Sequence, residues 1–131
     1  MAHCNTILSQ LLKLVPRHEF ETLAKRHHPG RSFRTASRWT QLVTLMMGQL
    51  SGRNSMRDLV ENISAQSHRL YHLDCRKISR SNLSRINEGK PYILYEALFE
   101  KLLSRCQGVA PSHKFQFNNP LYSLDASTID L

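Results

Sequence analysis

Apolar residues recur at helical spacing through most of the first 110 residues, which predicts a mainly α-helical domain. The clearest stretch begins at Ser55, with Asp58 three residues later, a spacing typical of a capping box. Apolar side chains occupy its i, i+3, i+4 and i+7 positions: Met56, Leu59, Val60 and Ile63. Comparable patterns over residues 7–15, 17–27, 37–50, 78–89 and 91–107 bring the prediction to five to six helices.

Two of these helices differ from the others in the width of their apolar surface. The helix over residues 37–50 is apolar around more than one face and is bounded by Ser37 and Gly52, so we expect it to be the central core helix. The helix that follows Pro91 should be stopped by Gly108 and Pro111. We expect its apolar stripe to face the core: Tyr95, Leu98, Phe99, Leu102, Leu103 and Cys106.

The pattern changes after residue 110. Residues 121–125 alternate as a β-strand does, with Tyr122 and Leu124 on one face and Asp125 at the end of the strand. We therefore expect a helical domain over residues 1–110 and a linker with one strand over 111–131, the strand being the beginning of a truncated second domain. From the residues alone, the better interpretation of Asp125 is a helix or turn cap that accepts backbone N–H bonds from the residues after it.

The charge of the chain is strongly positive. It has 18 Lys and Arg against 10 Asp and Glu, a formal net charge of +8, which favours nucleic acid as a partner over an anionic membrane, or else serves solubility alone. The loop over residues 28–36 is rich in turn-forming residues and contains Arg31 and Arg34, with Arg38 just beyond it. These three are candidates for phosphate contacts, although most charged loops are simply solvated.

The segment 78–89 has the residues of a DNA-reading helix. Leu83 and Ile86 are spaced to face inward, while the polar side chains can reach a DNA groove: Arg80, Ser81, Asn82 and Arg85. Arg pairs with guanine and Asn with adenine through paired hydrogen bonds. The alternative is a plain surface helix, and the connection to the preceding helix is longer than a helix-turn-helix motif usually has.

Other kinds of site receive little support. His68, His72 and Cys75 lie close together, but a fourth ligand at zinc-binding spacing is missing, so a chance cluster is the better interpretation. Three scattered cysteines do not make a disulfide framework, which favours a reducing cytoplasm. No apolar run reaches the ~18 residues that a membrane span needs, so no membrane partner is expected.

Three stretches carry a resemblance to a known family: residues 1–10, residues 94–103 and the final segment Leu-Tyr-Ser-Leu-Asp-Ala-Ser-Thr-Ile-Asp-Leu over 121–131. The chain resembles the N-terminal part of bacterial insertion-sequence transposases of the DDE class, in the group named after insertion sequence four. The resemblance implies a ribonuclease-H-like catalytic domain that begins with this strand and has Asp125 as its first catalytic carboxylate. Ala126 departs from the family, which usually has a hydroxyl residue there.

The resemblance also implies partners and cofactors. The full-length parent would bind transposon ends as double-stranded DNA, work as a homodimer at the bacterial nucleoid, and hold Mg²⁺ or Mn²⁺ through Asp125 and further carboxylates. The chain alone is expected to bind DNA without cutting it and to need no metal, because one Asp cannot hold a two-metal site. The alternatives are a stand-alone helix-turn-helix regulator, which has no need of the strand, and a helical dimerisation module, which leaves the basic charge unexplained.

Overall fold

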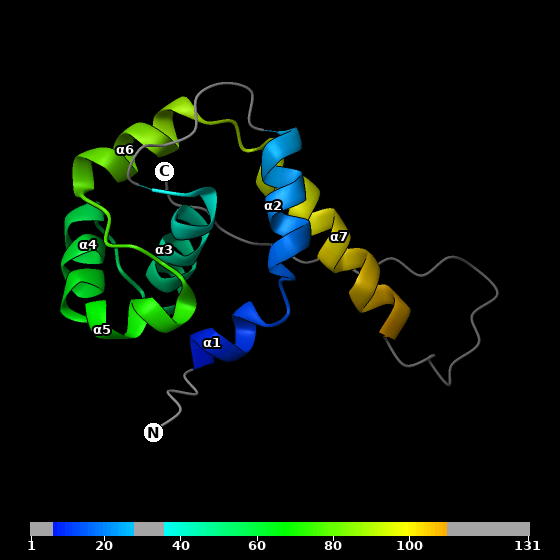
Figure 1. The fold of residues 1–131 in the computed structure, drawn as a ribbon, viewed down its shortest axis with the longest axis horizontal. Coiled ribbons are helices and arrows are strands. Elements are labelled where there is room, and N and C mark those ends of the chain that lie inside the picture. Colours follow the sequence, from blue (N-terminus) through cyan, green and yellow to red (C-terminus); the bar gives the residue numbers. More distant parts are fainter. Residues whose placement is uncertain (1–6, 28–35, 110–131) are drawn as a thin grey trace.

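The structure, a computed structural model, describes residues 7–27 and 36–109 (Figure 1). Within these ranges the chain forms seven α-helices and one short 3-10 helix. They are α1 (Ile7–Leu12), α2 (Arg17–Arg26), α3 (Arg38–Leu50), α4 (Met56–Ala65), α5 (Ser67–Leu70), η1 (Tyr71–Leu73), α6 (Arg80–Gly89) and α7 (Ile93–Val109). The mainly helical fold is therefore confirmed for this part of the chain, whereas the expected strand and the truncated domain lie outside the described residues.

Short polar residues begin three of the helices, and two of them, Ser37 and Ser55, are the residues that the sequence predicts at these helix starts. Ser37, Ser55 and Ser79 are the N-caps of α3, α4 and α6, and each side chain accepts a hydrogen bond from the backbone N–H three residues later. The first N–H groups of a helix lack partners within the helix, so such a cap typically stabilises it by about 1 kcal/mol. Pro16 separates α1 from α2 and is the N-cap residue of α2, where its missing N–H costs nothing.

A tight turn connects α3 to α4. One glycine in the turn and another within α3 allow the two helices to lie close together. Gly52 has a φ of 62°, in the left-handed region that favours glycine. Gly48 faces α4, where an added Cβ would lie 3.2 Å from the Cδ atoms of Leu59. The absence of a side chain at Gly48 therefore lets α3 and α4 approach closely.

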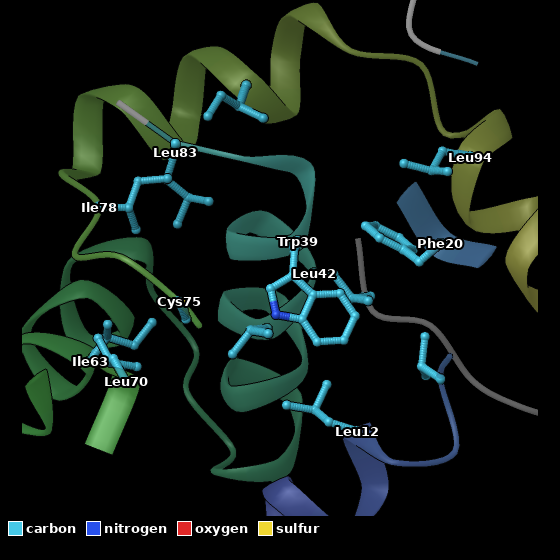
Figure 2. Packing of buried hydrophobic residues seen from close by; sticks show 14 of the residues in the cluster. Leu12, Phe20, Trp39, Leu42, Ile63, Leu70, Cys75, Ile78, Leu83 and Leu94 are labelled. Atoms are coloured by element: carbon cyan, nitrogen blue, oxygen red, sulfur yellow. The ribbon is translucent and has the colours of Figure 1, made fainter. Parts of the chain in front are cut away.

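Helix α3 lies at the centre of the hydrophobic core, as predicted (Figure 2). Its Trp39 points toward Phe20 of α2, with the ring centroids 5.6 Å apart in an edge-to-face arrangement, and Leu12 of α1 lies nearby. Residues from α4 to α6 form the other part of the core: Leu59, Ile63, Leu70, Cys75, Ile78, Leu83 and Ile86. Helix α3 thus packs between the N-terminal helices α1 and α2 and the elements from α4 to α6.

The prediction for the last helix needs correction. Leu94 and Leu98 are buried, with α2 packed against α7, but Phe99 is 63 % exposed and Leu103 43 % exposed, and Cys106 is exposed as well. A neighbouring helix covers only part of a helix's circumference, so it cannot bury a stripe this wide. Helix α7 also continues through Gly108, because one glycine costs about 1 kcal/mol in a helix and does not by itself end it.

The segment between α4 and α6 is more ordered than its irregular sequence pattern indicates. It contains α5 and η1. The residue that ends η1 is Asp74, whose φ of 50° lies in the left-handed region that Asp adopts more readily than most residues. The carboxylate of Asp74 forms an ion pair with Arg17 of α2. This contact joins the segment before α6 to the N-terminal half of the fold.

Candidate nucleic-acid interface

Helix α6 presents one face to the core and another to solvent. Leu83 has no exposed surface and Ile86 is 5 % exposed, and α6 packs against α4. Of the four residues predicted to read DNA, Arg80, Ser81 and Arg85 are exposed and Asn82 is half-buried. The structure therefore brings all four together on one anchored helix.

The polar side chains of α6 also contact one another. Arg85 Nη2 donates a hydrogen bond to Asn82 Oδ1 over 3.1 Å, and the hydroxyls of Ser79 and Ser81 lie 3.3 Å apart. The bond to Asn82 restrains the guanidinium of Arg85 along the helix surface. Less rotamer entropy is then lost when this guanidinium binds a base edge or a phosphate.

Two cations beside the helix did not feature in the sequence prediction. Arg76 and Lys77 are exposed, and they lie between Cys75 and Ile78, which are both buried. Burial of the residues on either side turns the pair outward, next to the first turn of α6. The signal was present as two adjacent basic residues before the Ser-rich helix start.

Arg38, predicted as a DNA contact, is not on this surface. Its side chain is 6 % exposed, Nη2 donates to the backbone oxygen of Pro91 over 3.3 Å, and the guanidinium lies 5.4 Å from the ring centroid of Tyr95. Burial lowers the pKa of Arg38, and the nearby Tyr95 opposes that change. The side chain of Arg38, at the start of α3, thus packs against the start of α7 and is part of the protein interior. Arg31 and Arg34 lie outside the described residues.

Metal-binding residues do not gather in the part of the chain that the structure describes. His68 and His72 are exposed, whereas Cys75 is buried, and burial raises the pKa of its thiol while a hydrogen bond with Thr40 opposes that change. Residues 7–27 and 36–109 contain no group of three His, Cys, Asp or Glu side chains that could hold a metal ion. Asp125, the carboxylate to which the resemblance assigns a metal, lies outside these ranges. Among the described helices, none is long and apolar enough to cross a membrane.

The short interhelical turn that a helix-turn-helix motif requires precedes α4, whereas the exposed cations lie at α6. α4 follows α3 after the turn over 51–55, whereas α5 and η1 separate α4 from α6. The exposed side of α4 has mixed charge, with Arg57 and Glu61, and Arg53 in the turn is paired with Asp58. Connection length therefore favours α4 as a reading helix, and charge favours α6.

Comparison with known proteins identifies one family. Residues 3–76 match the family described as "Domain of unknown function (DUF4372)". The match ends at Arg76, so α6 and α7 follow the matched region. Searches of the curated proteins and of the solved structures find no match. The matched region covers more than half of the chain, so the chain belongs to the DUF4372 family.

Proposed function

We propose that this chain is the DNA-binding helical domain of an insertion-sequence transposase. The observation that carries the proposal is a group of exposed cations on and beside α6, which we call the α6 surface: Arg76, Lys77, Arg80 and Arg85. These cations lie on, or just before, a helix anchored by buried leucine and isoleucine side chains, so they form a firm platform for a polyanion.

The position of its charges distinguishes the α6 surface from ordinary solubilising charge, because its four cations lie on and just before a single helix. In residues 7–27 and 36–109, the ion pairs join Arg17 to Glu21 and Asp74, Arg53 to Asp58, and Lys101 and Arg105 to Glu19. None of these ion pairs involves a cation of the α6 surface. Exposed cations elsewhere, such as Lys25 and Arg69, are in none of these ion pairs either, so the argument depends on the four cations being close together. Cations grouped at one helix raise the local positive potential, which attracts phosphates.

A pair of charge-matched variants tests the proposal. In the first variant the four cations of the α6 surface are changed to Gln; in the second, four exposed cations elsewhere are changed to Gln: Lys13, Lys25, Arg26 and Arg69. Each variant lowers the formal net charge from +8 to +4, so any difference between them reflects position. Binding to a fluorescent duplex is measured by anisotropy over a salt series.

The wild-type affinity should fall steeply with salt. Four phosphate contacts give a slope of log K against log salt of about −3.6, which is a loss of more than a hundredfold between about 50 and 200 mM salt. The α6 variant should lose most of this slope and the control variant little of it. Equal losses in both variants would show that only total charge matters, and no binding by the wild type at low salt would refute the proposal.

The transposase assignment rests on the resemblance around Asp125 and on this DNA-binding surface. In the proposed parent, the helical domain holds the transposon end while a ribonuclease-H-like domain carries out cleavage and joining. A divalent metal there would activate the attacking oxygen and stabilise the leaving one, with Asp125 as one of several carboxylates that hold it. The role of the residues in this chain is to bind and orient the DNA.

A second candidate function is self-association through α7. Tyr92 is 73 % exposed, Phe99 63 % and Leu103 43 %, and the last two lie on one side of the helix. Clusters of large apolar side chains in solvent often mark protein interfaces. Sedimentation velocity of the wild type and of a Phe99→Lys variant tests this: a dimer that the substitution disrupts supports a dimerisation module, and a monomeric wild type excludes it.

A further inference from the structure

The central helix α3 buries four polar side chains where apolar ones would be expected: Arg38, Thr40, Gln41 and Thr44. Burial of polar groups is unfavourable unless they form hydrogen bonds, so the partners of these residues are informative. Gln41 bonds to Asn87, in the last turn of α6, and the Thr40 hydroxyl accepts a 3.5 Å bond from the backbone N–H of Arg76, just before α6. Contacts from α3 therefore reach the chain just before α6 and also the last turn of α6.

The Gln41 contact is short, and its Gln41 end is buried while its Asn87 end is half-buried. Gln41 is 2 % exposed, and its Nε2 donates to Asn87 Oδ1 over 2.6 Å. Its Oε1 is buried and has no hydrogen-bond partner among the described residues, so the amide is only half satisfied. An apolar residue at this position would avoid the cost of that unpaired oxygen, which indicates that the hydrogen bond has a use other than stability.

We propose that Gln41 is a positioning residue, which sets the rotation of α6 about its own axis through Asn87 and thereby aims Arg85 and Asn82 at the DNA. This inference rests on the proposed function. The apolar contacts of Leu83 and Ile86 are non-directional and tolerate rotation, whereas a hydrogen bond does not. A rotation of about 20° moves side-chain tips that lie roughly 5 to 6 Å from the helix axis by about 2 Å, enough to break base contacts while phosphate contacts adapt.

The test replaces both hydrogen-bonding partners by apolar residues of similar size, Gln41→Met together with Asn87→Leu, so that no buried group is left unpaired. Gln49→Met is the matched control, since Gln49 lies on the same helix and is exposed. A duplex library with a randomised centre is enriched on the wild-type chain. The most enriched duplex and its shuffled version then serve as probes in competition binding, and circular dichroism verifies folding.

Discrimination between the two probes should fall by about tenfold in the pair variant, while affinity for the shuffled duplex and its salt dependence stay unchanged. Asn87→Asp, which keeps an oxygen acceptor for Gln41, should retain the discrimination of the wild type. If the pair variant does not fold, Asn87→Ala, which removes the half-buried partner of the hydrogen bond, supplies the same comparison.

A folded variant that discriminates as well as the wild type overturns the inference and leaves the proposed function intact. A wild type that binds duplex without preference overturns the inference alone, and a wild type that binds no duplex overturns both.

Discussion

Replacement of Trp39 by Phe tests the contact by which α3 holds the segment before α6. Trp39 is 6 % exposed, and its Nε1 donates a 2.9 Å hydrogen bond to the backbone oxygen of Leu73. The guanidinium of Arg17 lies 5.2 Å from the Trp39 ring centroid. Phe retains an aromatic ring against Phe20 but has no N–H and a smaller volume.

Three losses determine the expected size of the effect. An unpaired, partly buried carbonyl costs about 1 to 3 kcal/mol, and this site is at the lower end because the hydrogen bond is only part-buried. The space left by the smaller ring adds roughly 1 kcal/mol. The weaker attraction of Arg17 to a Phe ring adds a few tenths of a kcal/mol, roughly. We therefore expect Trp39→Phe to lower the free energy of unfolding by about 2 to 3 kcal/mol.

Urea denaturation followed by far-UV circular dichroism measures this change, since the substitution removes the sole tryptophan and its fluorescence. Tyr71→Phe is the control: Tyr71 is 83 % exposed, so its loss of one hydroxyl should change stability by less than about 0.5 kcal/mol. A loss of under about 0.5 kcal/mol for Trp39→Phe, with an unchanged m-value, would contradict the reasoning. The hydrogen bond to Leu73 would then contribute nothing in solution.

Three further predictions concern DNA reading, pH and catalysis. Arg85→Ala should lower the preference for an enriched duplex over a shuffled one by about 1 to 3 kcal/mol, whereas Arg57→Ala should not; the reverse result in competition binding would make α4 the reading helix. Burial raises the pKa of Tyr95 to about 12, so between pH 10 and 12 the unfolded state ionises first and stability should fall by up to about 2 to 3 kcal/mol. Tyr95→Phe should lack this part of the alkaline loss in denaturation curves; parallel curves would contradict the pKa change. In a transposase that contains this chain, Asp125→Asn should abolish Mg²⁺-dependent cleavage of supercoiled DNA but not binding, and normal cleavage by Asp125→Asn with loss in Asp130→Asn would reassign the catalytic position.

Local features of the sequence were enough to predict most of the helices and which side of α6 is exposed. Ser37, Ser55 and Ser79 act on backbone N–H groups within their own first turn, so their effect does not depend on the rest of the fold. The periodic spacing of Leu83 and Ile86 likewise decides which side of α6 is buried and which side carries Arg80 and Arg85.

Only the tertiary structure decided which polar residues are buried and which large apolar residues are exposed. Arg38 follows a basic loop in sequence yet is buried against Tyr95, and Phe99 belongs to an apolar stripe yet is 63 % exposed. The hydrogen bond from Gln41 to Asn87 joins residues 46 positions apart. Periodicity indicates which face of a helix can be buried, but not how much of that face a neighbour covers or which distant group meets a polar side chain there. Those outcomes depend on how the helices pack, because burial and hydrogen bonding are set by contacts between segments far apart in the chain.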